Sequence, residues 1–256
     1  MDALFSLIGP AGLALCLWIA LVSGVVKGMV GFAMPMIMIS GMSSILSPEL
    51  ALAGLILPTL FSNGMQALRQ GPRAAWGSVK RFRVFLIVGG AVLLLSAQLV
   101  SVLPAQVLYL AIGVPITLFA AAQLLGWKGD LPGGGGRAVE VAIAAFAGFI
   151  GGMSGVWGPP TVAYLTMIGT EKREQMRVQG VIYGLGAVLL TAAHVGSGVL
   201  NGNTVWLSLA LVPTAVFGMW LGGLAQDRID QQAFRRATLA VLLIAGLNLV
   251  RRALLG

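Results

Sequence analysis

Long stretches without any charged residue are the feature that most restricts what this chain can fold into. They cover residues 3–26, 28–48, 84–127, 141–170 and 178–226. A helix that crosses a bilayer needs about 20 apolar residues, so several of these stretches are long enough to cross twice. Only 9% of the residues are charged and the mean hydropathy is +0.94, whereas soluble domains carry about 25% charged residues. The sequence therefore predicts an all-α, polytopic membrane protein.

The formal net charge of +8 does not indicate a nucleic-acid partner. The basic residues lie in short segments beside the apolar stretches, where Lys and Arg determine which side of the membrane a loop occupies. We therefore expect a small anionic solute and the lipid bilayer as partners, no nucleic acid, and leave a homodimer open. Cys16 is the only cysteine, so neither an intrachain disulfide nor zinc-type spacing is available, and we expect no cofactor and no metal.

Glycine and proline interrupt two of the apolar segments. The first runs over 4–46 and breaks near 27–35, and the second runs over 138–168 and breaks near 151–160. Uninterrupted segments are predicted at 50–68, 84–102, 106–125, 178–195, 205–224 and 237–250. Four consecutive glycines within 127–137 are costly to order, so this stretch is expected to be a cytoplasmic linker. The predicted organisation is a first transmembrane repeat over 1–126, the linker 127–137, and a second repeat over 138–256.

The two broken segments resemble each other in sequence. At a fixed offset, five residues recur with the same spacing: Gly24, Gly28, Met29, Gly31 and Pro35 match Gly148, Gly152, Met153, Gly155 and Pro159. Glycine is common in this chain, but the shared spacing together with Met and Pro favours an internal duplication.

The distribution of basic residues predicts that the two repeats are inverted. If each broken segment enters the membrane and returns to the same side, 13 of the 16 basic residues fall on the cytoplasmic side. Arg251 and Arg252 then lie outside, and Lys27 lies within the membrane. Each repeat would contain a broken, re-entrant-like hairpin and three transmembrane helices. The N- and C-termini are both predicted to lie on the outer side of the cytoplasmic membrane.

The two breaks are the candidate substrate site. In inverted-repeat transporters, broken helices meet near the midplane, and their free N–H groups and positive dipole ends face anions. Met34-Pro35 and Gly158-Pro159-Pro160 are the predicted starts of half-helices. Lys27 lies at the first break without a nearby carboxylate in sequence, and charge within a bilayer is usually functional. Close helix packing by small residues and snorkelling of Lys27 to the surface are the alternative interpretations.

The predicted substrate-binding residues come from both breaks and from polar positions on neighbouring segments, where Asn63, Gln66 and Arg69 share one helix face at the spacing i, i+3, i+6. The predicted binding residues are Lys27, Gly28, Gly31, Pro35, Asn63, Gln66, Gly152, Ser154, Gly155, Trp157, Gly158, Pro159 and Gln179. Whether Arg69, Tyr183 and His194 take part is left open. No buried carboxylate pair, Ser/His/Asp arrangement or phosphate loop is apparent, so no catalytic residues are assigned and an enzyme is not expected.

The segments SGVVKGMVGFAMPM (23–36) and AGFIGGMSGVWGPPTVAYL (147–165), with the basic segment after the second helix, resemble the TauE/SafE family of sulfite exporters. The resemblance extends over nearly the whole chain. It implies a duplicated glycine-rich membrane unit that moves sulfite and organosulfur anions such as sulfoacetate across the bacterial cytoplasmic membrane. The first half departs from the glycine-rich pattern, because Ala33-Met34 stand where the second half has Trp157-Gly158.

Residues and resemblance together predict a secondary transporter that exports a small sulfur-containing anion. Two other classes stay open at this point. One is a transporter of a different solute, including a cation, which the lack of intramembrane carboxylates disfavours. The other is a membrane scaffold without transport activity.

Overall fold

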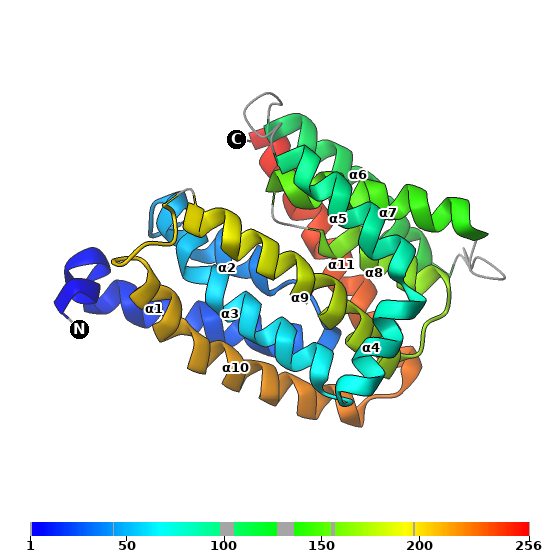
Figure 1. The fold of residues 1–256 in the computed structure, drawn as a ribbon, viewed down its shortest axis with the longest axis horizontal. Helices are drawn as coiled ribbons and strands as arrows, with labels where there is room; N and C mark the ends of the chain where they lie inside the picture. Colours follow the sequence, from blue (N-terminus) through cyan, green and yellow to red (C-terminus); the bar gives the residue numbers. More distant parts are fainter. Residues whose placement is uncertain are drawn as a thin grey trace. The chain divides into compact units, whose positions relative to one another are not determined.

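The computed structural model describes residues 2–42, 44–97, 105–126, 136–154, 157–196 and 198–255. These residues form helices joined by short connections, and no strand occurs among them (Figure 1). Five helical stretches are long and apolar enough to cross a membrane: Ile8–Val30, Leu50–Leu68, Lys172–Gly196, Val205–Arg228 and Gln231–Leu255. The prediction of an all-α polytopic membrane protein is confirmed.

The helices follow the order of the predicted segments. Their bounds are α1 Asp2–Val30, α2 Met34–Met42, α3 Pro48–Leu68, α4 Pro72–Arg81, α5 Arg83–Ala97, α6 Ala105–Leu124, α7 Gly136–Ser154, α8 Gly158–Met167, α9 Lys172–Gly196, α10 Val205–Arg228 and α11 Gln231–Leu255.

Both predicted breaks are present as interruptions between helices. The first separates α1 from α2, and the backbone turns there because Gly31 and Ala33 both adopt positive φ, of 87° and 75°. Ala33 is the only non-glycine residue with positive φ among those described, and such a conformation is unfavourable for a residue with a Cβ atom. The second interruption separates α7 from α8, which begins with Gly158 followed by two prolines. Both half-helices start where the glycine–proline patterns place them.

The helices form two compact units that are each assembled from separate stretches of the chain. The first unit contains residues 1–72 and 180–229, and the second contains residues 73–179 and 230–256. Each unit therefore combines helices from both predicted repeats. The inverted duplication and the division at the linker stay predictions about the sequence.

In the first unit, α1 and α10 run in parallel and in very close contact (Figure 1). Small residues on both helices make this approach possible. A Cβ atom added to Gly24 would lie 2.3 Å from the Ala215 carbonyl oxygen, and one added to Gly28 would lie 2.2 Å from the Met219 oxygen. From the other side, a Cβ on Gly222 would lie 2.0 Å from the Val25 oxygen. These glycines let the two helix backbones approach closely, as small-xxx-small spacing does at membrane helix interfaces.

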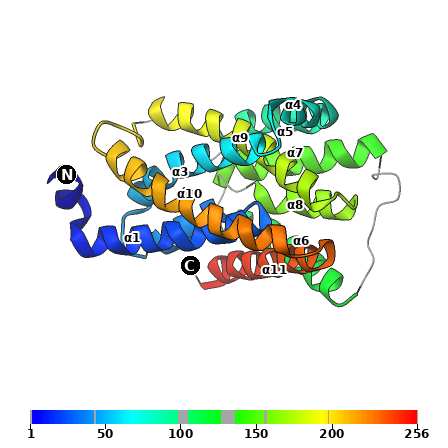
Figure 2. The same cartoon turned by 90° about the horizontal axis from the view of Figure 1, so that it is seen from below.

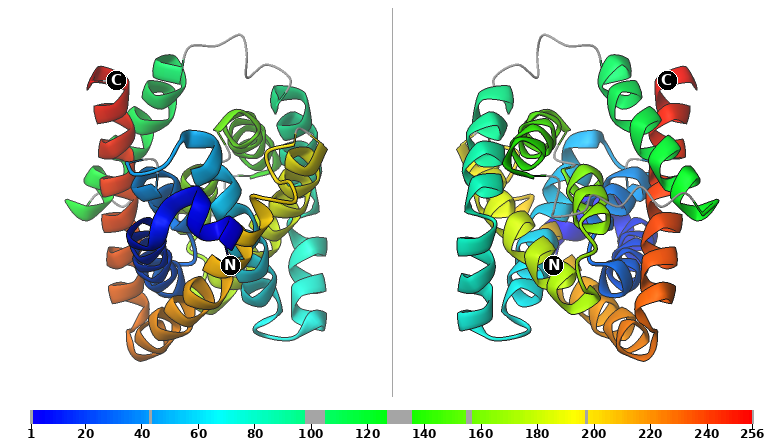
Figure 3. Two further views of the ribbon diagram at one scale, coloured as in Figure 1. Left: turned by 90° about the vertical axis from the view of Figure 1, so that its left-hand side faces the viewer. Right: turned by 90° about the vertical axis from the view of Figure 1, so that its right-hand side faces the viewer.

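The second unit repeats this arrangement with α7 and α5. A Cβ atom added to Gly148, the residue that matches Gly24, would lie 2.2 Å from the Gly89 carbonyl oxygen. The antiparallel pair α6 and α11 also cross closely (Figures 2 and 3), where a Cβ on Gly246 would lie 2.4 Å from the Thr117 hydroxyl oxygen. In both units, a glycine-rich broken segment packs on a helix from the other predicted repeat.

Two elements differ from the sequence prediction. The basic segment after α3 is the helix α4, whereas the charge pattern suggested only a cytoplasmic loop. The last helix, α11, covers 25 residues, although 237–250 was predicted, because its apolar part is extended at both ends by turns that carry Arg235, Arg236, Arg251 and Arg252. Long Arg side chains can keep their charges in water from the ends of a membrane helix.

Candidate functional site

Lys27 lies in the last turn of α1 and is only 1% exposed. Its ammonium donates a hydrogen bond to the side-chain oxygen of Asn63 on α3. Among the described residues, no carboxylate lies within ion-pair distance of Lys27. The predicted snorkelling alternative does not fit this burial. The site therefore has a buried lysine amino group whose partner is a neutral amide.

The side chain of Gln66 fixes the backbone at the first break. It lies about two turns after Thr59 on the same α3 face and donates a hydrogen bond of 3.0 Å to the Gly31 carbonyl oxygen. Gly31 directly follows the last residue of α1, and the carbonyl groups at a helix end have no partner within the helix. Gln66 therefore donates a side-chain hydrogen bond to the backbone at the end of α1.

A third residue of the same α3 face reaches the start of α2. The Ser62 hydroxyl lies 3.5 Å from the sulfur of Met34 and 3.2 Å from the Thr59 carbonyl oxygen. Ser62 was not among the predicted site residues, although its position four residues before Gln66 places it on the face that the Asn63 and Gln66 pattern identified. We call Lys27, Gly31, Met34, Ser62, Asn63 and Gln66 the Lys27 cluster.

The polar face of α3 continues beyond this cluster to Arg69. Its guanidinium lies 2.5 Å from the Asp227 carboxylate and 3.2 Å from the Gln226 side-chain oxygen, both at the end of α10. The side chains of the ion pair are 43% and 52% exposed, so water screens the attraction. The contact joins the ends of α3 and α10 next to the Lys27 cluster.

The start of α2 borders the same cluster through Met34. The Ala33 carbonyl accepts from the Ile37 N–H at 3.0 Å, which makes Ala33 the residue before the first helical turn. The first N–H groups of a helix have no partner within it, and they carry about half a positive charge. Pro35 has no N–H, but its ring favours the backbone conformation of a first helical turn. Met34 is completely buried beside Ser62.

The second break has a different environment from the first. Trp157 is 7% exposed and packs on Gly151, the position that matches Lys27: a Cβ atom on Gly151 would lie 2.8 Å from the indole ring. The Trp157 carbonyl also accepts from the Thr161 hydroxyl at 3.0 Å. A bulky ring in the second unit therefore covers the position where the first unit has an ammonium group.

The remaining predicted residues of the second half are placed less fully. Gly152 and Ser154 lie in the last turn of α7, Gly155 falls outside the described residues, and Gly158 and Pro159 begin α8.

Gln179 on α9 is completely buried but belongs to the second unit, and its role in binding stays a prediction. Gly28 packs against α10, which accounts for its lack of a side chain, and its place in the site also stays a prediction. No observation on the described residues supports the homodimer that the sequence left open.

Comparison with known proteins gives the family. No curated protein and no solved structure matches the chain. One protein family does match, Sulfite exporter TauE/SafE, and the match covers residues 16–249. This range includes both breaks and all the helices except the beginning of α1 and the end of α11. The chain belongs to the TauE/SafE family of sulfite exporters.

Proposed function

We propose that this protein is a secondary transporter that exports sulfite or a related organosulfur anion across the bacterial cytoplasmic membrane. The observation that carries the proposal is the buried Lys27 ammonium, which has an amide partner and no carboxylate among the described residues. Family membership supports the same solute class. A buried cation without a countercharge is unfavourable, and a bound anion supplies that charge.

The chemistry of the Lys27 cluster suits a small oxyanion. An ammonium group has three donors, of which Asn63 accepts one, so further donors are available to a ligand. Hydrogen bonds from an ammonium to an oxyanion are about twice as strong as bonds between neutral groups. The positive end of α2, which begins at Met34 next to Ser62, would add backbone N–H donors for the same anion. Asn63 holds the ammonium at the break, and Gln66 holds the backbone from which α2 starts.

The membrane potential favours the proposed direction. No nucleotide-binding motif is apparent in the sequence, and an inside-negative potential drives anions outward by about 2.3 kcal/mol per charge per 100 mV. Movement of one bundle of helices against another would expose the Lys27 cluster alternately to the two sides. In the proposed topology, the protein crosses the cytoplasmic membrane several times with both termini outside.

Counterflow in proteoliposomes tests the proposal. Liposomes containing purified protein and unlabelled sulfite are diluted into radiolabelled sulfite, and the exchange is measured for sulfite, sulfoacetate and a cation such as choline. We expect exchange of the sulfur anions, and loss of at least nine-tenths of the rate in Lys27→Ala. The control Arg236→Ala removes an exposed cation outside the Lys27 cluster and should retain the rate. Normal exchange by Lys27→Ala would contradict the role of the ammonium.

The two alternatives predict different results in the same assay. A cation transporter would exchange choline or another cation and would be insensitive to sulfite. A membrane scaffold would show no exchange of any solute and would co-purify with a stable partner. Exchange of sulfur anions that depends on Lys27 distinguishes the proposal from both.

A further inference from the structure

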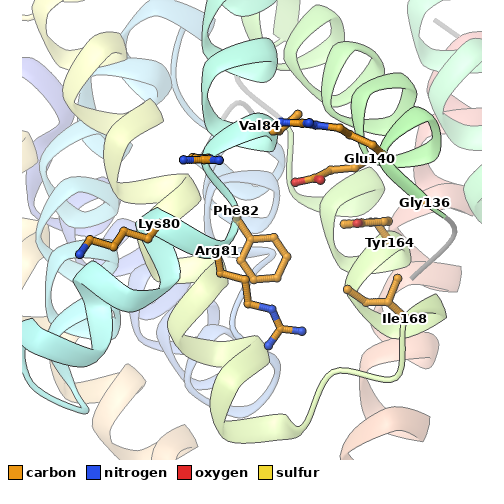
Figure 4. A pocket seen from close by; sticks show the side chains of 10 residues that line it. Lys80, Arg81, Phe82, Val84, Gly136, Glu140, Tyr164 and Ile168 are labelled. Carbon is orange, nitrogen blue, oxygen red and sulfur yellow. The ribbon is translucent and has the colours of Figure 1, made fainter. Parts of the chain in front are cut away.

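A cavity in the second unit lies at the junction of α4 and α5, beside the first turns of α7 and the end of α8. Its volume is about 560 Å³, within the usual range for small-molecule sites. Figure 4 shows Phe82 directed towards Tyr164, with Glu140 on the α7 side and Lys80 pointing away from the cavity. The lining residues come from four helices that belong to the same compact unit.

The lining is strongly basic, and part of its charge is not compensated. Arg81 is paired with Glu174 at 2.7 Å, so its charge is largely balanced. Arg83 and Arg137 also line the cavity, and neither has an acidic partner within ion-pair distance among the described residues. Glu140, the only acidic residue among the described residues of the lining, accepts a hydrogen bond from the Phe85 backbone N–H at 3.3 Å. Two guanidinium groups are therefore available to an anion.

The helices around this cavity change from charged to apolar sequence beside it, which is typical of the level of lipid headgroups. The apolar part of α5 begins directly after Arg83, and that of α7 begins directly after Glu140. The neighbouring helix α4 carries Trp76, which is 59% exposed and has the Lys80 ammonium 5.9 Å from its ring centre. A basic amphipathic helix with an exposed Trp is typical of the boundary between membrane and water.

We propose that this cavity binds the phosphate group of an anionic lipid headgroup. Arg83 and Arg137 would bind the phosphate oxygens in the bidentate geometry that guanidinium favours, and the Tyr164 hydroxyl provides another donor. Basic pockets between membrane helices are suited to such headgroups. The surface beyond Arg83 accommodates the acyl chains, because Ile87 on the next turn of α5 is 70% exposed.

A lipid fits this combination better than a free anion does. Inorganic phosphate would use the arginines alone, whereas a lipid also covers the exposed apolar surface of α5 from Ile87 to Leu95, which is likewise 70% exposed. The site is independent of the Lys27 cluster and of the proposed transport activity, so its test does not require transport.

Native mass spectrometry of the whole protein in a neutral detergent tests the proposal. The protein is titrated with phosphatidylglycerol, with phosphatidylcholine as a lipid of no net charge, and with inorganic phosphate or sulfite as free anions. We expect one phosphatidylglycerol to be retained at concentrations where phosphatidylcholine is not. Arg83→Gln with Arg137→Gln should weaken this binding about 30-fold, at about fivefold per basic residue.

Two further variants distinguish specific binding in the cavity from nonspecific electrostatic attraction and from misfolding of the protein. Arg228→Gln with Arg236→Gln removes the same charge from exposed positions outside the cavity and should bind phosphatidylglycerol like the wild type. Arg83→Lys with Arg137→Lys retains the charge but loses the bidentate geometry, so it should bind better than the Gln variant and more weakly than the wild type.

Each contrary outcome overturns the assignment. It fails if the cavity variant binds like the wild type, if the control loses as much affinity as the cavity variant, or if the Lys variant binds no better than the Gln variant. Displacement of the lipid by inorganic phosphate or sulfite at equal concentration would instead assign the cavity to a free anion.

Discussion

Lys27 in the last turn of α1 donates a hydrogen bond to Asn63 on α3, and this contact joins two segments that lie 36 residues apart in the chain. The charge pattern identified the lysine, and the helical spacing on the next segment identified the asparagine, but as separate candidates. Their contact makes them one site. It also indicates what a substrate has to provide, because Asn63 orients the ammonium without neutralising it.

Replacement of Asn63 by Asp should separate binding from folding. The Asp carboxylate has nearly the same shape as the Asn amide. It would supply the negative countercharge that the Lys27 ammonium lacks, so it would compete with an anionic substrate for the ammonium. Opposite charges about 4 Å apart attract by about 1 to 4 kcal/mol at the surface of a protein, so we expect the apparent KM for sulfite to rise about tenfold. Counterflow rates over a range of sulfite concentrations measure this change.

The matched control makes the same chemical change at Asn203, whose side chain is exposed in the connection before α10. Asn203→Asp should leave the KM for sulfite unchanged. An unaltered KM in Asn63→Asp would show that the anion does not approach Lys27.

Loss of the Gln66 side-chain amide should destabilise the first break. In Gln66→Leu, the Gly31 carbonyl loses the donor that lies 3.0 Å away, and the new side chain cannot replace it. Loss of one such hydrogen bond costs about 0.5 to 1.5 kcal/mol. We expect a lower midpoint of unfolding in detergent, measured by circular dichroism. Gln232→Leu, at an exposed position near the start of α11, should have little effect, and equal losses in both variants would argue against a special role of Gln66.

Close packing of α7 on α5 makes Gly148 intolerant of any side chain. A Cβ atom at this position would lie 2.2 Å from the Gly89 carbonyl oxygen, so Gly148→Ala requires the helices to separate. Overpacking of this kind costs about 1 to 3 kcal/mol. Gly90→Ala is the control, because nothing lies within 4 Å of its added Cβ. Thermal unfolding should show a loss only in Gly148→Ala, since alanine within a helix is intrinsically favourable. Equal stability of the two variants would contradict the described contact.

Thiol labelling tests the predicted orientation in the membrane. Cys16 is buried, so it should give little background, and Cys16→Ser removes it entirely. In that background, Asn203→Cys should react with a membrane-impermeant maleimide in intact cells, because the connection before α10 is predicted to lie outside. Gln232→Cys should react only after the cells are permeabilised. The reverse pattern would invert the proposed topology while leaving the helix assignments unchanged.

Helix positions were largely predictable because they depend on local properties of the chain. Charge-free stretches predicted the long helices, and glycine followed by proline predicted that α2 would begin at Met34 and α8 at Gly158. The helix α4 was missed because a basic, amphipathic segment at the membrane surface lacks the continuous apolar run that identifies a crossing. The turns at both ends of α11 were missed for a similar reason, since their arginines interrupt the apolar pattern.

The sequence by itself determined that this is a helical membrane protein with two broken segments and a lysine at the first break. Only the tertiary structure decided what each of these features contacts. It brings Asn63 to Lys27, packs α10 on Gly24 and Gly28, and covers Gly151 with the Trp157 ring. Helix formation depends on neighbouring residues, whereas the partner of a helix face depends on how distant segments pack, and many apolar faces in one chain offer similar surfaces. For that reason, two breaks that match in sequence differ in environment, and at the matching position only the first has a buried lysine.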